Sequence, residues 1–194
     1  MLKRGRPAVD QAIAPAHGVT RDGQPVSYNR APAPDLAPWI GRLYVTDVAL
    51  PEGHQVDCGL FNDSAMIRLQ LKGRWTARTA DGPRALERAA LFFGPQRRRM
   101  PIGVTGSFVS IGCSLRPGTG YAVMGANAAD FLDRMVVCNE LGLPGNLALG
   151  LIEKILDAEG RLLLLEDMIR KIVHRPGVAQ PDPADVARFG VDVL

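Results

Sequence analysis

Three histidines and three cysteines are the residues of this chain best suited to bind a metal ion or to act as nucleophiles. A metal site inside a β-barrel typically takes two histidines close together on one strand, a carboxylate and a further histidine. His17, His54 and His174 are far apart in the sequence and predict no such group. We therefore expect neither a metal nor a cofactor.

One short cluster, His54 with Asp57 and Cys58, could supply a histidine-paired thiolate. On a strand, however, Asp57 and Cys58 would point to opposite faces, which favours a surface histidine beside a buried cysteine. Cys113 and Cys138, like Cys58, have apolar neighbours, and no CxxC pair exists. We interpret all three cysteines as reduced and mostly buried.

Motifs of phosphate-binding and hydrolytic enzymes are missing from the sequence. It contains neither a GxxxxGK[ST] loop nor a GxSxG nucleophile elbow. Together with the scattered histidines, this predicts that the chain is not an enzyme.

Short strands separated by Gly and Pro turns dominate residues 36–115, a pattern typical of a small antiparallel barrel or sandwich. The segment 65–73 alternates between apolar and polar residues, as a strand with two different faces does. Its apolar face carries Ile67, Leu69 and Leu71, and its polar face carries Arg68, Gln70 and Lys72.

An apolar barrel interior could hold a small organic ligand, with Trp75, Gln96 or an inward-pointing arginine as the polar contact. A small barrel is also often filled by its own side chains, and the pattern leaves both possibilities open. The residues predicted to line the ligand site are Ile67, Leu69, Trp75, Phe93, Gln96, Val109 and Ile111.

Basic residues are concentrated between Arg68 and Arg99, where Asp81 and Glu87 are the only acidic ones. Such a stretch could attract an anionic ligand or a nucleic acid. It lacks the interleaved aromatic residues of a nucleic-acid platform, so we favour solvated arginines that protect strand edges.

Apolar residues recur at helical spacing over 147–173, which predicts two helices with a break at Glu159-Gly160. Pairs at i,i+4, Glu166 with Arg170 and Asp167 with Lys171, would support the second helix. The apolar stripe could pack on the barrel or on a second copy of the chain, and we predict a homodimer. The residues predicted for dimerisation are Ile155, Leu162, Leu165, Ile169 and Ile172.

The ends of the chain and its composition predict a cytoplasmic protein with no membrane contact. The mean hydropathy is near zero, the net charge is +3, and no apolar run approaches the roughly 20 residues of a membrane span. The basic start of the chain lacks the apolar segment of an export signal. We predict a flexible arm over 1–35, a barrel over 36–120, a helical dimerisation element over 121–178 and a linker over 179–194.

The order of these elements resembles the N-terminal sensor region of AraC-type bacterial transcription regulators. The resemblance rests on 91–95 and 107–118, on a following small-residue helix and acidic segment over 121–137, and on the helical pair. Residues 181–186 are similar to the segment that opens the DNA-binding part of that family.

The resemblance implies an α+β fold, with a cupin-like antiparallel β-barrel or sandwich followed by a C-terminal helical element. It also implies a small-molecule effector that modulates DNA binding by a C-terminal helix-turn-helix domain outside this chain. It transfers no individual contact residue. The alternatives are a stand-alone cupin-like enzyme, a small-molecule-binding protein and a partner-binding module without a ligand.

Overall fold

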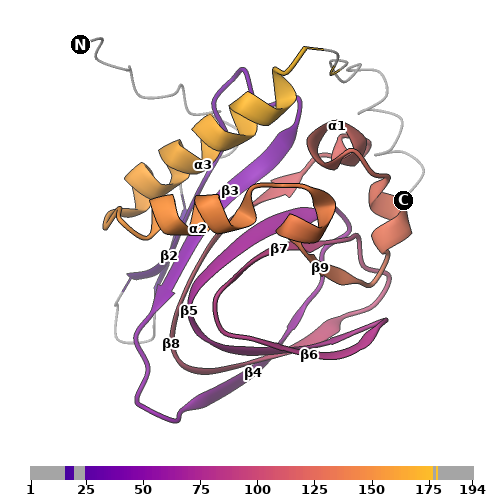
Figure 1. The fold of residues 1–194 in the computed structure, drawn as a ribbon. Helices are drawn as coiled ribbons and strands as arrows, with labels where there is room; N and C mark the ends of the chain where they lie inside the picture. Colours follow the sequence, from indigo (N-terminus) through magenta and orange to yellow (C-terminus); the bar gives the residue numbers. More distant parts are fainter. Residues whose placement is uncertain (1–15, 20–24, 177, 179–194) are drawn as a thin grey trace.

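The computed structural model describes residues 16–19, 25–176 and 178, and within them nine strands form one sheet in which every pairing is antiparallel (Figure 1). The main path of the sheet is β1-β2-β3-β8-β5-β7-β9, with β4 paired to β8 and β6 paired to β5. The strands are β1 (Ala16–Val19), β2 (Pro25–Arg30), β3 (Ile40–Val48), β4 (Gln55–Leu60), β5 (Met66–Thr79), β6 (Gly82–Leu86), β7 (Ala89–Phe93), β8 (Met100–Leu115) and β9 (Met135–Val137).

The two longest strands, β5 and β8, curl this sheet into a barrel-like shape (Figure 1). The first half of β5 pairs with β7 and its second half with β6, while the two halves of β8 pair with β4 and β3. Between these halves the register of β5 against β8 shifts around Lys72. Gly73 has a φ of 95° at this point, a left-handed conformation that glycine adopts easily. Such irregularities bend a strand and increase its twist.

Helices cover the outer face of the curled sheet (Figure 1). On α3, buried side chains recur at helical spacing and pack against the sheet. Among the described residues, no helix is long and apolar enough to span a membrane. The helical elements are α1 (Gly120–Met124), η1 (Ala128–Phe131), η2 (Cys138–Leu141), α2 (Gly145–Ile152) and α3 (Ala158–Val173).

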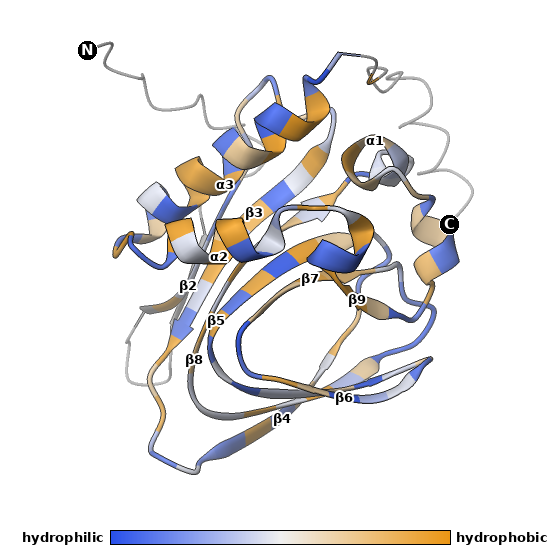
Figure 2. Ribbon diagram, viewed as in Figure 1, coloured by the Kyte–Doolittle hydropathy of each residue, from blue (hydrophilic) through white to orange (hydrophobic). Residues whose placement is uncertain are grey.

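Two apolar clusters lie on opposite faces of the sheet, because successive side chains of a strand point to opposite sides. Hydrophobic and hydrophilic residues follow one another along the strands (Figure 2). The first cluster lies between the sheet and the helices and includes Ile67, Phe92 and Leu165. The second lies inside the curl and includes Trp75 and Phe93. The predicted α+β fold, an antiparallel barrel-like sheet followed by helices, is confirmed.

The predicted flexible arm is wrong for residues 16–19, which form β1 and pair with β2, and for residues 25–35. Of the predicted arm, 1–15 and 20–24 lie outside the described residues, as does the predicted linker over 179–194. Strand β2 pairs with β3, and the following turn buries Ala31 and Ala33. The sheet thus extends beyond the predicted range of 36–120, and it also includes β9, where a helix was expected.

The break between the last two helices falls at 153–157 and not at Glu159-Gly160. The Asp157 side chain accepts a hydrogen bond of 2.6 Å from the Gly160 backbone N–H. Asp157 is therefore the N-cap of α3, and Glu159 and Gly160 belong to its first turn.

Candidate functional site

The predicted ligand residues lie on both faces of the sheet, so they do not form one site. Ile67, Leu69, Val109 and Ile111 are buried in the cluster between the sheet and the helices. Ile67 and Leu69 border a cavity of about 40 Å³ there, which α2 and α3 help to close. The prediction that these four line the barrel interior is wrong, because alternation separates two faces but does not show which one the helices cover.

Trp75 and Phe93 do lie inside the curl, where both are buried. Gln96 is buried as well, but its side-chain oxygen accepts a hydrogen bond of 2.9 Å from the Asn62 backbone N–H. The amide of Gln96 therefore holds together the loops at the ends of β4 and β7.

The sequence predicted that an inward-pointing arginine could contact a ligand but did not identify it, and in the structure Arg68 takes this position. Its Nε donates a hydrogen bond of 3.0 Å to the Tyr44 hydroxyl. The guanidinium carbon lies 5.4 Å from the ring centre of Phe93, 5.8 Å from that of Tyr44 and 5.9 Å from that of Trp75. Aromatic faces at these distances attract a cation, so three rings from three strands hold the guanidinium of the half-buried Arg68 in place.

Gly112 explains how Tyr44 reaches Arg68. Arg68 on β5 and Tyr44 on β3 are both register partners of Gly112 on the intervening β8. A Cβ added at Gly112 would lie 2.5 Å from the Tyr44 hydroxyl oxygen and 2.7 Å from its nearest ring carbon. Only glycine leaves room for the phenol to cross the central strand.

Gln70 lies two residues after Arg68 on the same face of β5. Its side chain is 2% exposed, and its Oε1 has no hydrogen-bond partner among the described residues. Buried polar atoms are nearly always paired, so an unpaired one calls for an explanation. The inward arginine site consists of Tyr44, Arg68, Gln70, Trp75 and Phe93.

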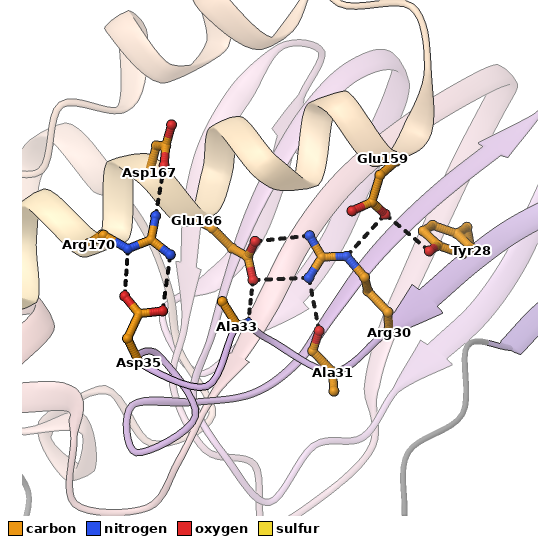
Figure 3. A network of polar contacts seen from close by, with 9 residues as sticks. All are labelled: Tyr28, Arg30, Ala31, Ala33, Asp35, Glu159, Glu166, Asp167 and Arg170. Carbon is orange, nitrogen blue, oxygen red and sulfur yellow. Dashed lines mark hydrogen bonds and ion pairs between the residues drawn. The ribbon is translucent and has the colours of Figure 1, made fainter. Parts of the chain in front are cut away.

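A second polar cluster, between β2 and α3, has its polar groups paired (Figure 3). Arg30 donates from both terminal nitrogens to Glu166, at 3.0 Å each, and from Nε to Glu159 at 3.1 Å. Glu166 also accepts from the Ala33 backbone N–H at 2.7 Å, and Tyr28 donates to Glu159. Burial alone would lower the pKa of Arg30, but these carboxylates outweigh it and raise the pKa.

This cluster is structural, and it corrects the predicted ion pair of Glu166 with Arg170. Glu166 faces Arg30 and not Arg170, whose Nε donates to Asp35 at 2.6 Å. Arg170 also pairs with Asp167, three residues earlier on the helix. Because β2 and α3 are far apart in the sequence, the pairing of Arg30 with Glu166 could not be predicted from it.

The candidate nucleophiles do not gather around the inward arginine site. His54 and Cys58 are exposed on or beside β4, so the expected burial of Cys58 is wrong. Burial raises the pKa of Cys113 and of Cys138 to about 12. Among the described residues, no three His, Cys, Asp or Glu side chains are grouped closely enough to hold a metal ion.

Most of the basic stretch is exposed, and Arg68 is the exception. Arg88 pairs with Glu153 and Arg97 with Asp133. The exposed remainder fits the preferred interpretation of solvated arginines. It comprises Lys72, Arg74, Arg78, Arg84, Arg98 and Arg99.

Three of the residues predicted for dimerisation are buried within their own chain. Leu162, Leu165 and Ile169 pack against the sheet, so they cannot contact a partner in this arrangement; the α3 stripe covers the barrel face instead. Ile155 and Ile172 are half-buried. The exposed leucines, as they are called below, are Leu147, Leu151, Leu156 and Leu163, on α2, on α3 and between them.

A family model described as "Domain of unknown function (DUF6597)" matches residues 28–137, more than half of the chain. These residues contain the whole inward arginine site. No curated protein matches the sequence.

Several solved structures are distantly similar. A protein of unknown function (DUF1255) from Acinetobacter sp. ADP1 is 10% identical, with a TM-score of 0.34 over 53% of this chain and 91% of that one. A cupin superfamily protein from Desulfitobacterium hafniense is 13% identical, with a TM-score of 0.31 over 59% and 93%. A variant of apo ToxT from Vibrio cholerae is 10% identical, with a TM-score of 0.39 over 78% and 64%.

Proposed function

The chain belongs to the DUF6597 family of domains, and on that premise we propose that it is the ligand-sensing and dimerisation domain of an AraC-type transcription regulator. In this proposal a small effector binds inside the curled sheet. Binding changes the arrangement of two copies, and a helix-turn-helix domain outside this chain reads the change out on DNA in the cytoplasm.

The observation that carries the proposal is the inward arginine site. Among the described residues, the half-buried Arg68 has one side-chain hydrogen bond, to Tyr44, and the buried amide oxygen of Gln70 has none. Both side chains lie on the same strand face. Ligand sites are typically apolar surroundings with a few convergent polar groups. Rings of Trp75 and Phe93 supply such surroundings here.

The chemistry of this site favours binding over catalysis. General acids and bases are most often histidine or carboxylate side chains. Among the described residues, the contacts of Arg68 are a phenol and aromatic rings. We therefore propose a receptor and not an enzyme.

The helical pair supports the dimerisation part of the proposal. Exposed leucines on α2 and α3 offer apolar area to a second copy. An effector that binds one dimer arrangement better than another shifts the population toward it, and only this differential affinity can carry a signal.

The first test is thermal melting of the purified protein with a library of anionic, neutral and cationic metabolites, with sedimentation measured alongside. A ligand of the native state must raise the melting temperature, and we expect one chemical class to do so in a dimeric protein. A protein that stays monomeric, with a melting curve that no compound moves, would contradict the proposal. Metal analysis and turnover of the bound compound would reveal an enzyme instead.

A further inference from the structure

We propose, resting on the sensing function above, that the effector is a small organic carboxylate that also carries a hydrogen-bond donor. Its carboxylate binds Arg68, and its donor binds the Oε1 of Gln70. Three observations on the concave face of β5 support this assignment.

The first observation is the missing counter-ion of Arg68. No carboxylate of the described residues lies within ion-pair distance of its guanidinium. By contrast, Arg30 and Arg170, which also link packed elements, each contact two carboxylates. Arg68 is only half-buried, so an anion from solution can reach its guanidinium and supply the missing counter-charge.

The second observation is the geometry of the free nitrogens. Nε of Arg68 is occupied by Tyr44, whereas the two terminal nitrogens donate to no group among the described residues. The donors of a guanidinium form a rigid fork that matches a carboxylate in two parallel hydrogen bonds. Since three rings already restrict the guanidinium, little further ordering is needed on binding.

The third observation is the unpaired amide oxygen of Gln70, which can only accept a hydrogen bond. Residues two apart on a strand are separated by about 6.6 Å along it, so a molecule of modest size can span both side chains. A hydroxyl or N–H on the ligand would pair this oxygen and recover the cost of its burial.

These features together select an organic monoanion with an apolar body. One guanidinium balances one negative charge, and the rings of Trp75 and Phe93 favour a hydrocarbon or aromatic part next to it. Aromatic and branched hydroxy acids have all three elements.

The experiment compares matched small molecules on the full chain. The probes are 4-hydroxybenzoate, benzoate, 4-hydroxybenzamide and 3-hydroxybutyrate, each at millimolar concentration. Melting temperature and tryptophan fluorescence report binding, because Trp75, one of the two tryptophans of the chain, lies over the guanidinium. We expect 4-hydroxybenzoate to bind more tightly than benzoate and than 3-hydroxybutyrate, which lacks the aromatic body, and the amide not to bind. At about a hundredfold excess over Kd, the melting temperature should rise by about 5–10 °C.

Substitutions assign the effect to its residues. Arg68→Gln should abolish carboxylate binding, and Arg68→Lys should retain a weaker response because it keeps the charge without the fork. Gln70→Leu should remove the preference for hydroxy acids over benzoate, a change that a purely structural role would not produce. Arg78→Gln, which removes an exposed arginine from the same strand, is the matched control. Circular dichroism verifies that each variant is folded.

Three outcomes overturn the inference: the amide binds as well as the acid, Arg68→Gln binds undiminished, or no carboxylate shifts the melting curve. If a neutral or cationic metabolite raises the melting temperature instead, sensing stands and the carboxylate assignment falls. If carboxylates bind through Arg68 without changing the sedimentation of the protein, the carboxylate assignment stands. The proposal that the ligand changes the arrangement of two copies is then contradicted.

Discussion

On β5, Arg68 and Arg78 carry the same charge on one strand, but only Arg68 lies among aromatic rings. The difference arises from neighbours that alternation along one strand cannot reveal. Gly112 lets the Tyr44 phenol cross β8, and the bend at Gly73 brings Trp75 to the same region. Residue type alone therefore could not identify the candidate site.

Gly112→Ala should lower the free energy of unfolding by about 1–3 kcal/mol, because the added methyl meets the Tyr44 phenol and the Ile67 carbonyl oxygen. Urea unfolding of both proteins measures the change. Gly150→Ala is the control: nothing lies within 4 Å of its added Cβ in α2, so it should stabilise by up to about 1 kcal/mol. A Gly112→Ala protein as stable as the parent would contradict the placement of Tyr44.

Thiol reactivity should divide the three cysteines into two classes. Cys58 is exposed, whereas Cys113 and Cys138 are buried with pKa values raised to about 12. The thiolate is the reactive form, so a disulfide reagent at pH 8 should modify Cys58 rapidly in the native protein and all three only after denaturation. Cys58→Ser should remove the rapid phase. A rapid phase that persists in this variant would show that another cysteine is exposed.

At the scale of elements, the sequence predicted strands better than it predicted their partners. Alternation over 65–73 and the Gly and Pro turns were enough to predict an antiparallel sheet. Which face the helices cover was not predictable, because both faces of β5 carry buried residues. The prolines of 25–35 predict an extended arm, whereas its pairing with β3 and α3 is non-local and leaves no local sequence signal.

The ion pair of Arg30 with Glu166 should be strongly coupled. Glu166→Gln leaves the buried guanidinium without its main counter-charge and should cost about 3–5 kcal/mol. Adding Arg30→Met removes that charge, so the double variant should be more stable than the sum of the single losses by at least about 1 kcal/mol. Denaturant unfolding of all four proteins completes the cycle.

The matched control for this cycle is the exposed pair of Arg88 with Glu153. Glu153→Gln should change stability little, because water screens an exposed pair. Simple additivity of the Arg30 and Glu166 substitutions would show that the two side chains act independently.

At the scale of the whole molecule, the proposed homodimer can be tested at the exposed leucines. Leu147→Glu combined with Leu163→Glu should raise the dissociation constant of the proposed dimer at least about tenfold, the loss typical of central apolar contacts. Sedimentation velocity over a concentration series measures it. Phe61→Glu, which changes an exposed aromatic residue before β5, should leave the dimer intact, and the reverse pattern would place the interface elsewhere.

The sequence predicted the helical pair but assigned the wrong surface to the partner. Apolar residues at helical spacing show that a helix packs against another surface, but they do not identify that surface. In this fold the sheet of the same chain takes Leu162, Leu165 and Ile169. The surface available to the proposed dimer therefore lies outside the stripe, and only the three-dimensional arrangement identifies it.

The ion pair between β2 and α3 also constrains how the chain is made. Arg30 and Glu166 are 136 positions apart. Arg30 therefore leaves the ribosome long before Glu166 has been synthesised. Until then, docking of β2 would bury a cation without its counter-charge, at a cost the nascent chain avoids by keeping this segment in water. Assembly of β2 should therefore wait for α3, and synthesis interrupted before that helix should leave a protein that proteases recognise at its first strands.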